Sequence, residues 1–319
     1  MDSKLIVFGK TSQNLEDILH EHGIFDMLYC YNLEDCLNLC NKVCENVENI
    51  VVLCKNNQID LLVEKLKTAD DTLSLINDQA VKMERQTVFK NIYFIPFEAD
   101  FEKLLQSVLP KKEQFVYSVF GKSEKFLEDK LSVLASEDFK YNIVAKNSFL
   151  HIVYSTKPID KQLFEGGVFS DKNESLASAL KYALKSKTLC IADQMSAGSL
   201  SFKISRYCKE NLISSDLILQ ENDFEKVGID KLFLDQNPSA SKETVFAVAK
   251  NLLKKYKTDF VLVLAGFNCD GGRTFVAAGD LQQINVYSSV FYGSSDEIIE
   301  NSTNFAIFKT ICLINEKEI

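Results

Sequence analysis

Short apolar runs alternate with segments of helical periodicity through the first third of the chain. Runs that are apolar at successive positions are typical of strands buried on both faces of a parallel sheet. The predicted strands are Leu5–Phe8, Met27–Tyr31, Ile50–Cys54 and Ile92–Ile95. The predicted helices lie near Leu15–His20, Leu33–Val47, Leu61–Leu66 and Phe101–Leu109. This βαβα order predicts a small, doubly wound α/β domain over residues 1–110.

The middle of the chain has a shorter pattern. A strand at 115–120 and a helix at 124–134 precede two strands, 141–145 and 150–154, which a polar turn joins. This β-α-β-β order is too short for an independent enzyme and predicts an inserted module over residues 115–160. Pro110 and the polar run after it are the expected linker.

Residues 165–319 return to alternating helices and strands. The predicted strands are Leu189–Ala192, Phe260–Ala265, Thr274–Ala278 and Ile284–Val290. The predicted helices are Glu174–Leu184, a segment carrying Leu200 and Ile204, a segment beginning at Ser241, and Asp296–Leu313. This pattern predicts a mixed α/β domain around a central sheet.

Composition narrows the class of protein. The length of 319 residues predicts two domains or two with a small insert, and 46% hydrophobic with 25% charged residues excludes wholesale disorder. The net charge of −9 disfavours binding to a nucleic-acid backbone. No apolar run reaches the ~18 residues that span a bilayer, and the first residues lack the pattern of a signal peptide. We therefore expect a cytoplasmic protein without a membrane partner.

The cysteines and arginines limit the chemistry further. Cys36, Cys40 and Cys44 recur at helical spacing among leucines and valines, which indicates buried thiols rather than metal ligands. No CxxC motif occurs, and an odd count of nine favours free thiols, so we expect neither a metal site nor a cofactor. The sequence has only three arginines, Arg85, Arg206 and Arg273, and these are the residues that could bind a phosphate with two parallel N–H hydrogen bonds.

Two loops of the third unit are candidate sites. The first, Asp193–Ser199, lies between a predicted strand and a predicted helix, where Ser196, Ala197 and Gly198 could offer helix N-terminal amides to an anion. The alternative is a tight turn in which Ser196 caps the helix.

The second candidate loop, Gly266–Arg273, follows the most hydrophobic strand, and ligands of open α/β sheets bind at the carboxyl ends of strands. Its candidate ligand-binding residues are Gly266, Asp270, Gly271, Gly272 and Arg273. Arg273 could bind the phosphate of a small nucleotide together with the first loop. The alternatives are a glycine-rich hairpin connection and a loose pair between Arg273 and Asp270.

At these loops the sequence resembles the CinA family. Residues 189–198 are similar to the A-E-S-C-T-G-G strand-turn-helix of the family's C-terminal domain, and the helix start at Ser241 resembles its G-A-V-S-x-E segment. The loop at Gly266 resembles the T-G-I-A-G-P-x-G-G loop. Upstream, residues 119–124 resemble the V-F-G-x-x-E start of a KH-like module, and residues 94–96 resemble a region of the molybdopterin-binding-like domain.

The resemblance implies three domains. These are a molybdopterin-binding-like domain at 1–110, a KH-like module at 115–160, and a nicotinamide mononucleotide deamidase-like domain at 165–319. It also implies a homodimer.

The motif positions differ from the family where catalysis is expected. The resemblance places the nucleophile position on Gln194, the motif glutamate on Asp193 and the motif threonine on Ser196. The lysine-bearing Y-S-N-E-x-K segment corresponds to residues 219–224, which contain no lysine. The N-terminal T-G-G-L-G-P-T loop is replaced by Cys54–Gln58.

Two functions stay open at this point. One is a descendant that has lost amidohydrolase chemistry and serves as a nucleotide-binding or regulatory protein, since a nucleophile and its base are of little use apart. The other is an active nicotinamide mononucleotide deamidase in pyridine nucleotide salvage, in which Ser196 replaces the lost nucleophile and Asp193 or Asp270 orients a water molecule.

Overall fold

The computed structural model describes residues 3–9, 19, 27–43, 47, 49–76, 80–85, 90–97, 114–136 and 138–316. Of the predicted elements, the helix at 101–109 and all of the helix at 15–20 except Leu19 lie outside these residues, as do Cys44 and residues 110–113 of the linker. The chain divides into two compact units. Unit 1 comprises Met1–Val116, Glu128–Val144 and Val153–Asp160, and unit 2 comprises Tyr117–Leu127, Ala145–Ile152 and Lys161–Ile319.

Unit 1 contains a six-stranded sheet in the order β2-β1-β3-β6-β5-β4. Its strands are β1 (Ser3–Phe8), β2 (Met27–Cys30), β3 (Asn49–Cys54), β4 (Asp71–Ile76), β5 (Ala80–Arg85) and β6 (Lys90–Pro96). The first three and β6 pair in parallel, as predicted, but β4 and β5 form an antiparallel hairpin at the edge. The four predicted strands are thus the parallel ones, and the edge hairpin β4–β5 was not predicted. Residues 72–75 of β4 are exposed, so the hairpin lacks an apolar run.

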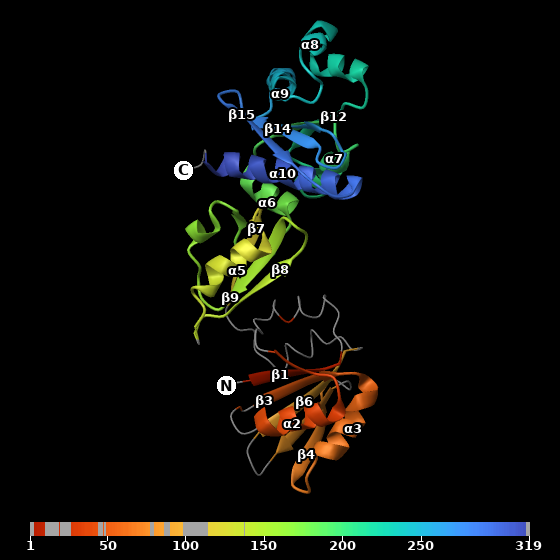
Figure 1. Ribbon diagram of the computed structural model, residues 1–319, viewed down its shortest axis with the longest axis vertical. Helices are drawn as coiled ribbons and strands as arrows, with labels where there is room; N and C mark the ends of the chain where they lie inside the picture. The colour runs from red at the N-terminus through yellow and green to blue at the C-terminus, as the bar shows by residue number, and fades with distance from the viewer. Residues whose placement is uncertain are drawn as a thin grey trace. The chain divides into compact units, whose positions relative to one another are not determined.

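Two helices cover one face of this sheet. Helices α2 (Leu33–Val43) and α3 (Asn56–Leu66) bury Cys36, Cys40 and Leu62 against the strands (Figure 1). The expected role of Cys36 and Cys40 as small core residues is confirmed, because both are fully buried.

A four-stranded sheet in the order β10-β7-β9-β8 follows. It contains β7 (Phe115–Phe120), β8 (Tyr141–Ala145), β9 (Leu150–Ser155) and β10 (Val168–Ser170), and α5 (Glu124–Ser132) follows β7. A 3-10 turn, η1 (Lys161–Phe164), precedes β10. The strands 115–120, 141–145 and 150–154 were predicted, whereas the boundary of a separate module at 115–160 stays a prediction.

The remaining elements of unit 2 surround a five-stranded sheet in the order β12-β11-β13-β14-β15. Its strands are β11 (Leu189–Asp193), β12 (Leu212–Leu217), β13 (Phe260–Gly266), β14 (Arg273–Gly279) and β15 (Ile284–Val290). Its helices are α6 (Leu176–Leu184), α7 (Ser199–Cys208), α8 (Lys231–Gln236), α9 (Lys242–Tyr256) and α10 (Ser295–Glu316), with a 3-10 segment η2 (Glu221–Val227).

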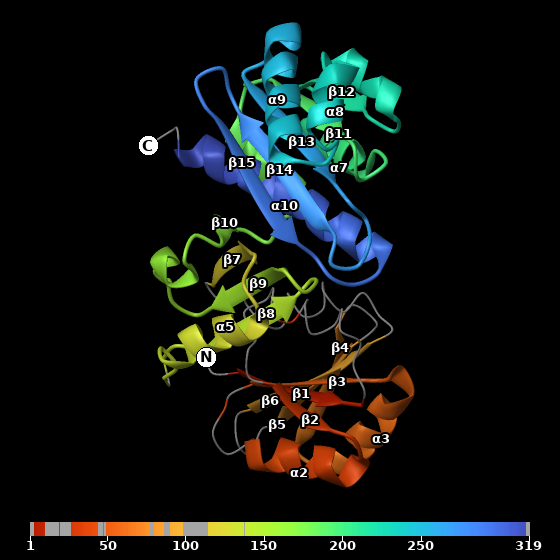
Figure 2. The ribbon, with the colours of Figure 1, turned by 45° about the horizontal axis from the view of Figure 1, so that its top comes forward.

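The five-stranded sheet is covered on both faces. One core joins it to α6, α7 and α10, and the other joins it to α9 and the segment around η2 (Figure 2). The helix predicted to begin at Ser241 is α9, and Ser241 is its cap, because its hydroxyl accepts a bond from the Thr244 N–H at 3.2 Å. The mixed α/β class expected from the sequence is confirmed.

Candidate functional site

The structure brings the two predicted loops side by side. Strands β11 and β13 pair in parallel, with Asp193 opposite Leu264, so both strands end at the same edge of the sheet. The Gln194 N–H donates to the Leu264 carbonyl at 2.9 Å. A Cβ on Gly266 would lie only 2.6 Å from the Arg273 carbonyl oxygen of the neighbouring strand, so this close backbone approach requires glycine.

The first loop is closed by its own hydrogen bonds. Asp193 is fully buried, and its carboxylate accepts bonds from the N–H groups of Ser196 at 2.8 Å, Gly198 at 3.0 Å and Met195 at 3.1 Å. The Ser196 hydroxyl donates to the same carboxylate and accepts a bond from the Leu200 N–H at 3.0 Å. Asp193 and Ser196 therefore hold the turn in shape.

The cap of helix α7 differs from the expected one, and a binding role for this loop stays a prediction. Helix α7 begins at Ser199 after Gly198, which has a φ of 95°, so Gly198 and not Ser196 is the cap residue. The N–H groups of Ser196 and Gly198 already donate to Asp193, and they are not available to a phosphate. Ala197 is exposed and also has a positive φ, 49°.

The second loop is a tight hairpin connection. The Gly272 N–H donates to the Cys269 carbonyl at 2.7 Å, and a Cβ on Gly272 would lie 2.3 Å from the Phe267 carbonyl oxygen. Asp270 accepts a bond from the Gly293 N–H at 3.0 Å, and no ion pair joins it to Arg273 in the described chain. Arg273 is exposed. The geometry thus favours the alternative of a structural connection.

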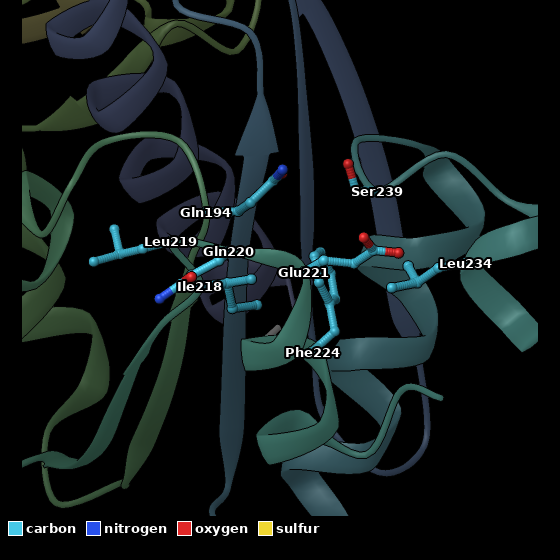
Figure 3. Close-up of a pocket in the computed structure, with 8 residues that line it drawn as sticks. All are labelled: Gln194, Ile218, Leu219, Gln220, Glu221, Phe224, Leu234 and Ser239. Atoms are coloured by element: carbon cyan, nitrogen blue, oxygen red, sulfur yellow. The ribbon is translucent and has the colours of Figure 1, made fainter. Parts of the chain in front are cut away.

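Gln194, which follows β11, also lines a pocket of about 390 Å³ (Figure 3). It is lined by Gln194, Ile218, Leu219, Gln220, Glu221, Phe224, Leu234 and Ser239. Gln194 is the only predicted site residue among them. Periodicity gave no signal for the others, but the family resemblance had pointed to residues 219–224, which form one wall.

The wall at 219–221 is positioned by a buried carboxylate. Asp223 accepts bonds from the N–H groups of Leu219 at 2.9 Å and Gln220 at 3.0 Å. The Lys226 ammonium, at 2.7 Å, is the main reason that the pKa of Asp223 lies below its usual range, and the two backbone bonds lower it further. Asp223 therefore keeps Glu221 at the rim of the pocket.

The described residues offer little other chemistry. They contain no group of three His, Cys, Asp or Glu side chains placed to hold a metal ion. Burial raises the pKa of the Cys190 and Cys208 thiols to about 11, which keeps both protonated and unreactive at neutral pH. No helix in the described part of the chain is long and apolar enough to cross a membrane.

Comparison with known proteins adds one informative relative. No protein-family model matches the chain. A CinA-like protein of Endomicrobium trichonymphae is 22% identical to it over 250 residues, which cover 66% of this chain and 58% of that protein. The chain is therefore similar to a CinA-like protein. It spans little more than half the length of this curated relative, and the resemblance expected from the sequence is confirmed at the level of the family.

Solved structures of the CinA superfamily are also similar to part of the chain. A Klebsiella pneumoniae protein is 14% identical and covers 44% of this chain and 96% of its own, with a TM-score of 0.42. An Escherichia coli protein is 15% identical and covers 43% and 87%, with a TM-score of 0.41. The loss of the CinA-type nucleophile and base at Gln194 and residues 219–224 stays a prediction.

Proposed function

We propose that the chain is a CinA-like protein that binds a small nucleoside or nucleotide in the pocket lined by Gln194, here called the Gln194 pocket. We propose further that it does not hydrolyse the carboxamide of a nicotinamide nucleotide bound there. The observation that carries the proposal is the chemistry at the end of β11. An amide side chain, Gln194, faces the pocket where the resemblance places the nucleophile, and the nearest hydroxyl in sequence, that of Ser196, is held by Asp193.

Amide hydrolysis by a nucleophilic side chain needs an activated nucleophile beside a base. The side-chain amide oxygen of Gln194 is too weak a nucleophile to attack a carboxamide carbon. The Ser196 hydroxyl already donates its proton to Asp193 and receives the Leu200 N–H, so attack by its oxygen would dismantle the turn. Ser239 lines the pocket, but no lysine or histidine is among the eight lining residues.

The pocket is better suited to binding. Ile218 and Phe224 are buried and form an apolar floor, while Gln194, Gln220 and Ser239 offer polar groups around it. A few placed polar groups over an apolar surface are the usual make-up of a small-molecule site. Such a protein would function by binding its ligand rather than by converting it, as a binding or regulatory protein.

The test is ammonia release from nicotinamide mononucleotide by the purified full chain, with ligand-induced thermal stabilisation measured in parallel. We expect stabilisation with ammonia at the background rate. Gln194→Ser should also stay at background, because the partner lysine is missing.

Turnover by the wild-type chain would contradict the proposal. If that turnover were lost in Ser196→Ala or Ser239→Ala while the variant kept the wild-type free energy of unfolding, the chain would be an active deamidase with that serine as its nucleophile. Gln236→Ala, an exposed change on α8, is the matched control.

A further inference from the structure

A second pocket, of about 350 Å³, lies within unit 2 and shares no lining residue with the Gln194 pocket. It opens where β10 and the residues after it meet α6 and the C-terminal end of α10, and these three elements contact one another. The apolar part of its lining is buried and consists of Phe169, Ala179, Ala183 and Ile311. The two alanines lie one turn apart on α6 and leave room beside the larger side chains. The pocket can therefore take an aliphatic group against an apolar surface.

One carboxylate of this pocket is held in place but has no cation beside it. Glu174 is half-buried, and its oxygens accept bonds from the Ser170 hydroxyl and, at 3.0 Å, from the Ser178 hydroxyl. No basic side chain of the described residues lies within ion-pair distance of it, whereas the neighbouring Asp171 is paired with Lys161 at 2.6 Å. Hydroxyl bonds orient a carboxylate without neutralising it, so Glu174 can accept a bond from the ammonium group of a ligand.

The lining also carries one cation that has no acidic partner. The Lys172 ammonium lies 5.0 Å from the centre of the Tyr182 ring, and both side chains are exposed. No carboxylate in the described part of the chain lies within ion-pair distance of Lys172, not even that of Glu174, two residues away. The ring attracts the ammonium but leaves its charge in place. The pocket thus presents one negative and one positive group, unpaired with each other, beside an apolar lining.

We infer that this pocket binds a free α-amino acid with an aliphatic side chain. The ammonium of the ligand would pair with Glu174, its carboxylate with Lys172, and its side chain would lie on the apolar lining. A ligand with a single charge leaves one of the two residues unpaired, and a ligand without a side chain leaves the apolar lining in contact with water. The inference does not depend on a ligand in the Gln194 pocket.

Calorimetric titration of the full chain with four matched probes tests this selectivity. L-Leucine has both charges and the side chain, isopentylamine lacks the carboxylate, 4-methylpentanoate lacks the ammonium, and glycine lacks the side chain. We expect leucine to bind at least about three-fold more tightly than the amine or the acid, the effect of one partly exposed ion pair. Glycine should bind at least about ten-fold more weakly than leucine, because it buries no aliphatic carbon beyond its Cα.

Two variants assign each charge of the ligand to a residue. Glu174→Gln keeps acceptors for the serine hydroxyls and removes the charge, so it should weaken leucine binding about three- to five-fold. Leucine should then lose its advantage over 4-methylpentanoate but keep its advantage over isopentylamine. Lys172→Gln should weaken leucine binding by a similar factor and give the opposite pattern with the two analogues. Lys181→Gln, an exposed change on α6 outside the pocket lining, is the matched control and should change no affinity.

Thermal unfolding of each variant, expected at the wild-type midpoint, confirms that the changes in affinity do not come from a damaged fold. Equal binding of leucine and its single-charge analogues by the wild-type chain would overturn the inference. The same pattern of analogue affinities in Glu174→Gln and Lys172→Gln, or no binding of any probe, would overturn it as well.

Discussion

Removal of the Asp193 carboxylate should show that this residue is structural. Its oxygens accept three backbone N–H bonds of 2.8–3.1 Å and the bond from the Ser196 hydroxyl, and the residue is fully buried. Each hydrogen bond to a charged group contributes about 1.5–3 kcal/mol, but four donors that share one carboxylate are lost together and do not add. We expect Asp193→Ala to lower the free energy of unfolding by about 3–5 kcal/mol.

The conservative variant gives an intermediate result. In Asp193→Asn one oxygen can still accept bonds, but the new NH₂ group faces N–H donors, so the expected loss is about 2 kcal/mol. Asp235→Asn on α8 is the control, since Asp235 is exposed, and should change the free energy by less than about 0.5 kcal/mol.

Urea unfolding together with amide hydrogen exchange makes the measurement. Because the chain has two compact units, exchange at residues 195–200 reports the turn directly, without a two-state assumption for the whole protein. We expect these amides to exchange much faster in Asp193→Ala. Unchanged stability and unchanged protection in that variant would refute the structural role and return Asp193 to the list of catalytic candidates.

Three further outcomes are expected. Gly272→Ala should destabilise the chain by about 1–3 kcal/mol in urea unfolding, because its Cβ would lie 2.3 Å from the Phe267 oxygen; a neutral result would contradict the tight connection. The Lys226 bond lowers the pKa of Asp223 in the folded chain, so the ionised Asp223 stabilises the fold. This contribution to the free energy of unfolding is complete above the pKa of an unfolded aspartate and is lost as the pH falls through the folded pKa. When the free energy of unfolding is measured against pH, Asp223→Asn should therefore reduce its fall at acidic pH. An unchanged fall would contradict the contribution of the ionised Asp223. Arg273→Ala should leave the affinity for nicotinamide riboside unchanged in calorimetry, and a weakened affinity would restore Arg273 to the site.

Strands that are buried on both faces were the easiest to predict from the sequence. Strands β3 and β13 are almost wholly buried, so their composition alone identified them. Strand β12 alternates half-buried and exposed residues, and β4 is exposed at four successive positions, so neither has an apolar run to detect. Such strands exist because neighbouring strands supply their hydrogen bonds, which composition does not record.

The two candidate loops lie next to each other, and their role as a binding site stays a prediction. The glycines and the strand ends correctly located both loops. The role of Ser196 depended on the left-handed Ala197 and Gly198, which turn the amides of 196 and 198 back onto Asp193. The pocket itself is completed by η2 and α8, which are too short to show a helical hydrophobic period in the sequence.

One proton NMR experiment tests the central claim most directly. Nicotinamide riboside is mixed with the full chain, and its pyridinium ring resonances are followed overnight. Broadening of the ring signals reports binding, and a shift of the same signals reports conversion of the carboxamide to the carboxylate. We expect broadening with no conversion; conversion of the ligand, or sharp signals unaffected by the protein, would contradict a pocket that binds without hydrolysis.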